Sequence, residues 1–197
     1  MRDMIKMVLV IAILSSFSGG LLAALKNSTK EQIENQQLTF VKGPAILSIL
    51  KGCDNDPIKD RFKITDGDKE KSFFVGIKDG KAQFVVFEDF GKGFGGDIGV
   101  MVGVDVNTDK IIGIGVTTHS ETPGLGSKAQ TEPAFGAQFA GIGLGETVKV
   151  KSGGGKIDAL TGATITSSGV CLAVTTAGEV YKRIKDKIVE KTKSFSK

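Results

Sequence analysis

The chain has no Trp, one Tyr, one His and two Cys among its 197 residues. Cys53 and Cys171 form no CxxC pair and neither lies near His119 in the sequence, so the residues do not support a zinc site. The absence of Trp, the single Tyr and the lack of a recognition motif argue against nucleic-acid binding. Cys171 is expected to be a small buried thiol, with a Cys53–Cys171 disulfide as the alternative.

Glycine is abundant by contrast, at 27 residues, but shows no G-x-y period. This excludes a collagen-like chain and indicates a loop-rich fold with close approaches between backbones. Gly91, Gly93 and Gly95 resemble a phosphate-binding loop, but no helical pattern follows them, which disfavours a dinucleotide fingerprint. The net charge of +4 owes much to the tail after Gly178, which is typical of a solvated helix face.

Residues 7–25 form an uncharged segment of 19 residues, long enough to cross a bilayer as a helix. The sequence therefore predicts a transmembrane anchor over residues 1–26. A cleaved signal peptide is the alternative, because Ser18 and Gly20 supply a passable small-residue cleavage site. Basic residues lie on both sides of the segment and determine its orientation only weakly.

We expect residues 27–71 to form a helical stalk and linker. Its first part shows helical spacing up to Gly43-Pro44, where the run breaks, and a short apolar helix follows at 45–50. Residues 52–71 are polar and rich in turn formers, and are predicted to be a surface loop.

Residues 72–197 are predicted to be the folded domain. Asp79-Gly80 indicates a β-hairpin between strands at 73–78 and 82–87, and Asn107-Thr108-Asp109 a second hairpin. The complete set of further expected elements is strands at 98–106, 110–118 and 147–151 and helices at 132–140 and from 167 to about 192. The chain is thus predicted to be α+β, with a single N-terminal transmembrane helix and a domain of antiparallel β-hairpins with flanking helices.

The last helix is predicted to be amphipathic. Its apolar residues follow one another at intervals of three and four, which places them on one face directed toward the core. They are Val170, Val174, Ala177, Tyr181, Ile184 and Ile188.

A cluster of five hydroxyl side chains lies within residues 161–168, just ahead of this helix. Ser and Thr commonly cap helix N-termini, and the free N–H groups there also attract anions. The residues alone therefore leave two alternatives, a capped helix without a ligand and a phosphate site near Thr164 or Thr166.

The run from Asp158 to Thr164, Asp-Ala-Leu-Thr-Gly-Ala-Thr, resembles the flavinylation motif of the bacterial FMN-binding domain family. The resemblance implies that a flavin transferase attaches FMN through its phosphate to Thr164, and that Asp158 serves recognition by the transferase. It also implies further residues that contact or make room for the cofactor: Thr161, Gly162, Ala163, Ile165 and Thr166.

The run Glu121-Thr122-Pro123-Gly124-Leu125-Gly126 resembles the second signature of the same family. Its Pro and Gly residues alone predict a tight exposed connector between a strand and a helix. The resemblance implies that Thr122, Gly124, Leu125 and Gly126 line the isoalloxazine ring, and that Glu121 or His119 tunes the flavin or passes protons.

Together the signatures, their order and the single span resemble the RnfG/NqrC family of FMN-binding subunits. Chain length favours the RnfG branch, because NqrC chains are typically longer. The resemblance implies an electron-transfer subunit of an Rnf complex, which couples ferredoxin:NAD+ oxidoreduction to Na+ or H+ translocation. The implied partners are other membrane subunits, the flavin transferase and the membrane.

The implied location is the inner (plasma) membrane, with the soluble domain on the extracytoplasmic side, and a complete reaction is not expected of this chain alone. An NqrC-type subunit, a stand-alone membrane-anchored flavin module and a ligand-free structural domain remain the alternatives.

Overall fold

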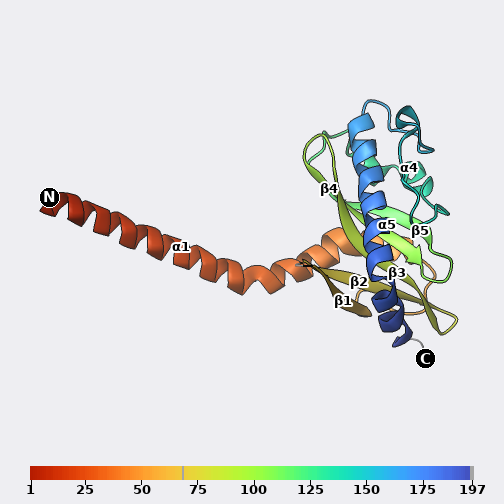
Figure 1. Ribbon diagram of the computed structural model, residues 1–197, viewed down its shortest axis with the longest axis horizontal. Coiled ribbons are helices and arrows are strands. Elements are labelled where there is room, and N and C mark those ends of the chain that lie inside the picture. The colour runs from red at the N-terminus through yellow and green to blue at the C-terminus, as the bar shows by residue number, and fades with distance from the viewer. Residues whose placement is uncertain (68, 196–197) are drawn as a thin grey trace. The chain divides into compact units, whose positions relative to one another are not determined.

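The computed structural model describes residues 1–67 and 69–195 and divides into two units, Met1–Thr39 and Phe40–Lys197. Figure 1 shows the order of the elements along the chain. Residues 196 and 197, which end the predicted domain at 72–197, lie outside the described residues. The two units are considered separately.

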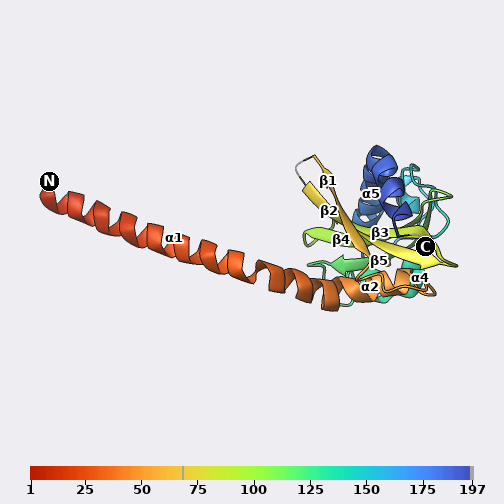
Figure 2. The same cartoon turned by 90° about the horizontal axis from the view of Figure 1, so that it is seen from below.

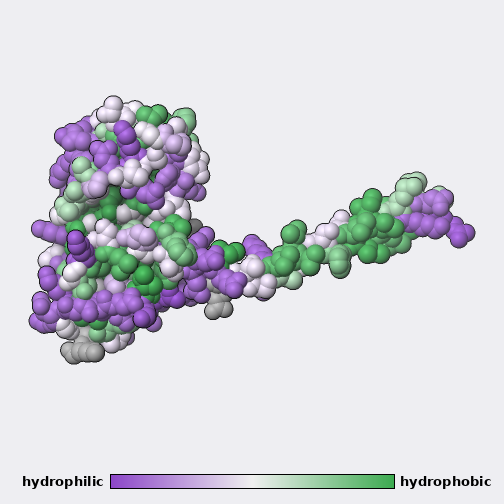
Figure 3. Space-filling model, turned by 180° about the vertical axis from the view of Figure 1, so that it is seen from behind, coloured by the Kyte–Doolittle hydropathy of each residue, from purple (hydrophilic) through white to green (hydrophobic). Residues whose placement is uncertain are grey.

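The first unit is formed by α1 (Arg2–Gln36), one continuous helix of 35 residues. Its stretch Arg2–Lys30 is long and apolar enough to cross a membrane, and its apolar side chains are exposed. Figure 3 shows these hydrophobic side chains along α1. Apolar residues all round a helix fit a lipid environment rather than one face of a water-soluble domain.

A π-helix, η1 (Gln37–Lys42), links α1 to α2 (Gly43–Ile49). The prediction that Gly43-Pro44 breaks the helical run is wrong, because both residues belong to α2. Pro44 occupies the first turn of α2, where its missing N–H needs no intrahelical partner. Gly43 and Pro44 are therefore part of a helix, and α2 packs against the sheet of the second unit.

That sheet is an antiparallel meander of five strands in the order β1-β2-β3-β4-β5. Both predicted hairpins are confirmed, and Asp79 and Gly80 have the positive φ angles, 52° and 72°, that suit a two-residue hairpin turn. The strands are β1 (Arg61–Asp66), β2 (Lys69–Lys78), β3 (Lys81–Lys92), β4 (Asp97–Asp105) and β5 (Lys110–Thr118).

Strand β1 corrects the prediction that residues 52–71 form a surface loop. Phe62 and Ile64 are buried while the residues between and beside them are exposed, which is the alternation of a strand with one covered face. The charged residues that suggested a loop are those that commonly protect an edge strand.

Two other predicted elements also differ in the structure. The strand expected at 147–151 is wrong: Val150 makes only an isolated bridge to Ile157, and η2 (Lys151–Gly153) follows it. The helix expected at 132–140 is shorter in the structure, as α4 (Pro133–Ala137), and a separate short helix, α3 (Lys128–Thr131), precedes it. Pro133 holds its predecessor Glu132 in an extended conformation, which separates them.

Helix α5 (Thr164–Lys193) begins three residues before the predicted start at 167. All six predicted stripe residues are buried, and α5 packs against β3 and β4. Figure 2 shows α5 on one face of the sheet and α2 on the other. The fold is α+β, as predicted. Cys53 and Cys171 are both free thiols, and Cys171 is buried as expected.

The approach of α5 to the sheet depends on paired glycines. A Cβ at Gly91 of β3 would lie 1.9 Å from the Gly169 carbonyl oxygen, and one at Gly169 would lie 2.5 Å from the Lys92 carbonyl oxygen. Two backbones therefore meet without intervening side chains. This contact fixes the height of the first turns of α5 above the sheet.

Candidate functional site

The structure brings the two sequence motifs together. The loop Glu121–Gly126 follows β5 and lies against the first turn of α5, where the Thr166 hydroxyl donates a hydrogen bond to the Glu121 carboxylate across 45 residues of sequence. A Cβ at Gly162 would lie 3.2 Å from Leu125 Cδ2. The segments that the resemblance assigns to one cofactor are therefore neighbours in space.

The first turn of α5 presents Thr164 to solvent. Ala163 is the N-cap residue, and within the described chain no side chain makes a capping hydrogen bond to this helix. Of the two alternatives that the residues left open, a helix capped by a Ser or Thr side chain is therefore not the one observed. The first N–H groups of a helix have no intrahelical partner and lie at its positive end, so this turn suits an anion.

The hydroxyl cluster divides into two groups. Thr166 and Ser167 are buried, whereas Thr161, Thr164 and Ser168 are exposed. Only exposed hydroxyls can be reached by a modifying enzyme in the folded protein. Thr164 stands at the first helical position and has that access.

Ser167 has a structural role that the sequence motif did not indicate. Its Oγ donates to the Ala163 carbonyl at 2.9 Å and accepts the Leu160 N–H at 2.9 Å. Gly162, with φ of 76°, makes the intervening turn possible. The segment before Thr164 is thus fastened to the helix that follows it.

The loop from residue 121 to 126 is closed by its own hydrogen bonds. The Leu125 and Ser127 N–H groups each donate to the Thr122 carbonyl at 3.2 Å, and the Gly124 N–H donates to Ser127 Oγ at 2.9 Å. Gly124 has φ of 76°, which favours glycine. Leu125 remains 46% exposed, so its apolar side chain is available to a ligand beside Gly162.

Glu121 differs from the rest of its motif because it points inward. Its carboxylate is buried and accepts hydrogen bonds from the Gly95 N–H, at 2.7 Å, and from the Thr166 hydroxyl. The β3–β4 turn therefore belongs to the site, which the sequence alone did not indicate. The glycines at 93 and 95 were the only available signal.

His119 lies at the base of the loop. Its Nδ1 accepts the Glu121 N–H at 3.3 Å, and its Nε2 lies 3.3 Å from Gln130 Oε1. Gln130 in turn donates to the carbonyls of Val116 and Thr117 at the end of β5. The imidazole thus connects the strand end to the loop.

Asp158, at the beginning of the first motif, is exposed and held from two sides. Lys151 Nζ lies 2.7 Å from its carboxylate. The Gln138 side-chain amide pairs with its backbone, accepting the Asp158 N–H at 2.7 Å and donating to the Asp158 carbonyl at 3.3 Å. The carboxylate is consequently held at the surface.

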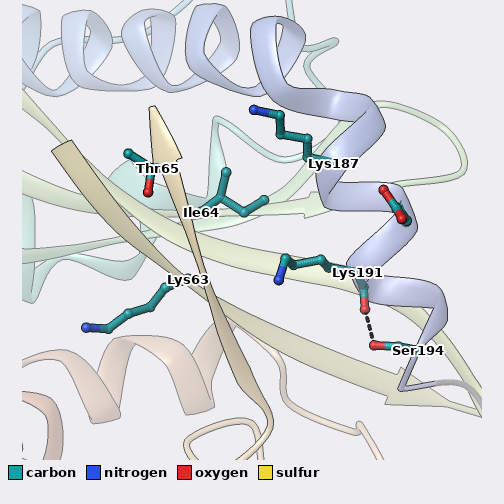
Figure 4. A pocket seen from close by; sticks show the side chains of 7 residues that line it. Lys63, Ile64, Thr65, Lys187, Lys191 and Ser194 are labelled. Atoms are coloured by element: carbon teal, nitrogen blue, oxygen red, sulfur yellow. Dashed lines mark hydrogen bonds between the residues drawn. The ribbon is translucent and has the colours of Figure 1, made fainter. Parts of the chain in front are cut away.

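Two surface cavities lie away from both motifs. One, of about 470 Å³, opens between β1 and the end of α5, where Figure 4 shows Lys63, Lys187 and Lys191. The other, of about 850 Å³, lies among α2, β5 and α4. The described residues contain no group of three or more His, Cys, Asp or Glu side chains suited to a metal ion.

Comparison with known proteins identifies the family. A sequence model described as FMN-binding domain matches residues 93–179. The G subunit of the ion-translocating oxidoreductase complex of Vibrio parahaemolyticus is 30% identical over 194 residues, covering 92% of this chain and 90% of that protein. The chain belongs to the RnfG family.

The corresponding G subunit from Methanosarcina acetivorans is 29% identical over 177 residues, covering 89% of this chain and 93% of that protein. Among solved structures, the C subunit of the Na+-translocating NADH-quinone reductase from Parabacteroides distasonis aligns with a TM-score of 0.54 and 25% identity, covering 64% of this chain and 76% of that one. NqrC from Shewanella oneidensis gives a TM-score of 0.53 and 25% identity, covering 70% and 75%.

The matched domain of this RnfG family member contains the whole site. Residues 93–179 begin in the β3–β4 turn, include both motifs and end within α5. The match supports FMN as the cofactor of the segments that the fold brings together.

Proposed function

We propose that the chain is the electron-transfer subunit of an Rnf-type ion-translocating oxidoreductase complex and carries FMN covalently on Thr164. The observation that carries this proposal is the contact between the Glu121–Gly126 loop and the first turn of α5. Membership of the RnfG family and the match to the FMN-binding domain support the same function.

The residues present fit FMN. The exposed Thr164 hydroxyl stands at the positive end of α5, where a phosphate ester is favoured by free N–H groups and by the helix dipole. The exposed, apolar Leu125 is available to an isoalloxazine ring, with Gly162 leaving room beside it. Thr122, Gly124, Gly126, Thr161, Ala163 and Ile165 complete the proposed binding segments.

Bound FMN would supply the capacity to store one or two electrons and to pass them singly. The chain's own contribution is to fix position. Ser167 holds the segment before Thr164, the hydrogen bonds of Thr122 and Ser127 hold the loop, and α1 is proposed to keep the unit at a membrane. A covalent link prevents loss of the cofactor on the extracytoplasmic side, where we propose that the soluble domain lies.

Attachment requires a separate flavin transferase, because an unassisted Thr hydroxyl is a weak nucleophile. In the proposed step, Thr164 Oγ1 forms the bond to phosphorus, loses its proton and displaces the leaving group of the donor that the transferase holds. We propose that the exposed carboxylate of Asp158, held by Lys151, is recognised by that enzyme.

The attachment site is tested by Thr164→Val, with the exposed Ser168→Ala as the matched control. We expect covalent flavin to disappear in the first variant and persist in the second, as measured by in-gel fluorescence and intact mass after expression with the transferase. Because Thr164 is exposed, its replacement should change the free energy of unfolding by only about 1 kcal/mol or less.

Flavin that survives Thr164→Val would contradict the assignment. Thr161 would then be the better second candidate, because it is exposed whereas Thr166 is buried. Unmodified wild-type protein from cells that contain the transferase would contradict covalent attachment altogether.

An NqrC-type role is the second candidate, favoured by the similarity to the two solved structures from sodium-translocating quinone reductases. The two roles differ in the other proteins of the complex. Co-purification of the tagged full-length chain from its native membrane, followed by identification of the bound proteins, distinguishes them. Recovery of the chain alone would favour a stand-alone flavin module.

A further inference from the structure

The Glu121 carboxylate lies where three separate segments of the chain meet. It begins the loop at 121–126, accepts the Gly95 N–H of the β3–β4 turn at 2.7 Å and accepts the hydroxyl of Thr166 in α5. The residue is only 6% exposed. One side chain therefore joins a loop, a turn and a helix that are not adjacent in sequence.

Glycines surround this carboxylate closely. A Cβ at Gly93 would lie 2.5 Å from Oε1, and a Cβ at Gly126 would lie 2.8 Å from Oε2. A Cβ at Gly95 would lie 2.0 Å from the Ser120 carbonyl oxygen. The backbone is packed around the carboxylate on several sides, which restricts the side chain to this one orientation.

Hydrogen bonds, and no ion pair among the described residues, hold the Glu121 carboxylate. Among the described residues, none of the ion pairs involves Glu121. Two donors and the positive end of α5 stabilise it instead. Removal of either donor would leave a buried, poorly solvated carboxylate, so the segments depend on one another.

We propose that Glu121 is a positioning residue: its carboxylate locks the 121–126 loop onto α5 and onto the β3–β4 turn. The lock sets Leu125 beside Gly162, and hence relative to Thr164. Glu121 therefore does not contact the isoalloxazine ring but holds the segments that do. The part concerning flavin rests on the proposed function, whereas the lock itself exists in the protein without cofactor.

The lock is tested first in full-length protein made without the transferase, by amide hydrogen exchange at Gly95, Leu125 and Ser127. Thr166→Val, which keeps the shape and removes the donor, and Glu121→Ala should raise these exchange rates about tenfold or more. Thr166→Ser and the surface control Ser168→Ala should leave them nearly unchanged. Glu121→Gln should raise them less than Glu121→Ala, because the amide keeps one of the two acceptor oxygens and loses the charge.

Thr166→Val provides the test even where Glu121→Ala fails to fold. Unchanged exchange in folded Thr166→Val would overturn the lock. Loosening of the loop by Glu121→Gln equal to that by Glu121→Ala would also overturn it, since the geometry would then not depend on hydrogen bonding.

The positioning role is tested on protein expressed with the transferase. Thr166→Val should retain flavin on Thr164 but lower its fluorescence anisotropy, because the ring is no longer held by a fixed loop, and Thr166→Ser should restore the wild-type value. Unchanged anisotropy in a variant whose loop exchanges faster would overturn positioning. Absence of covalent flavin from wild-type protein would instead defeat the proposed function and leave the exchange test standing.

Discussion

At the scale of single residues, the glycines at positions 91 and 169 control how closely α5 approaches β3. A methyl group at either would overlap backbone atoms of the other segment, and backbone cannot move aside as a flexible side chain can. The spacing between α5 and the sheet therefore depends on the absence of a side chain at both positions. The position of Thr164 depends on the same spacing.

We expect Gly91→Ala to lower the free energy of unfolding by about 1–3 kcal/mol, because the added methyl group overpacks this contact. Gly113→Ala in β5 is the matched control, since its Cβ would lie 3.8 Å from Ile49 in ordinary contact. Urea unfolding followed by circular dichroism measures both. Equal stability of the two variants would contradict the close approach.

Cys171 gives a second prediction at this scale. Burial raises the pKa of its thiol to about 11, so almost no thiolate is present near neutral pH. Burial also raises the pKa of Cys53, but that residue is partly exposed. In native protein, iodoacetamide should modify Cys171 more slowly than Cys53, and urea should abolish the difference. Peptide mapping measures the rates, and rapid native labelling of Cys171 would contradict its burial.

The sequence could propose residues of the site but not their contacts. Thr164 and Leu125 are proposed because contiguous motifs resemble those of a known family, and their roles stay predictions. The sequence could not predict that Glu121 points inward or that Ser167 bonds to the segment before Thr164, because each depends on contacts that form only on folding. Gly95, for example, lies 26 residues from Glu121 in the sequence. A sequence motif does not show whether its Glu is buried or exposed.

At the scale of elements, α5 is predictable because its apolar period repeats over many turns. The two hairpins are predictable because Asp79-Gly80 and Asn107-Thr108-Asp109 are residue types that favour turns. Strand β1 was missed because six residues with four charged or polar side chains resemble a loop. Its formation depends on pairing with β2 and on contact with α5, neither of which is local.

The contact between β1 and α5 includes a bidentate pair, in which Arg183 donates to the Asp66 carboxylate at 2.9 and 2.5 Å. Hydrogen bonds from Arg183 lower the pKa of Asp66 below its usual value of 3.8. A pKa lowered by folding means that the pair stabilises the fold above pH 3.8, and that this contribution is lost as the pH falls through the lowered pKa.

We therefore expect Asp66→Asn to lower the melting temperature modestly at pH 7 and to match wild type at a pH below the lowered pKa of Asp66. The exposed Asp186→Asn, on the same helix as Arg183, is the control for general charge effects. Thermal unfolding at a series of pH values gives the comparison. A difference that persists unchanged in acid would show that the pair does not cause it.

At the scale of the whole molecule, the two units have separate physical tasks. The apolar surface of α1 is exposed along its length, whereas all residues of the hydrophobic core belong to the second unit. Stability of the second unit should therefore not depend on the helix, and membrane retention should depend on it entirely.

Deletion of residues 1–39 is expected to move the protein from the membrane fraction to the soluble fraction without loss of cooperative unfolding. Cell fractionation and thermal unfolding of the shortened chain measure the two effects, with the full-length chain in detergent as the reference. Loss of the folded state on deletion would show that α1 is part of the stabilising structure.

The exposure of Thr164 in an otherwise fastened segment has a consequence for the order of biogenesis. Its hydroxyl is accessible once the chain has folded, so addition of a group there requires no partial opening of the protein. Under the proposed function, synthesis and folding can therefore be completed first, and covalent attachment can follow whenever the flavin transferase and its donor become available. Folded protein without flavin would then be a normal intermediate of maturation.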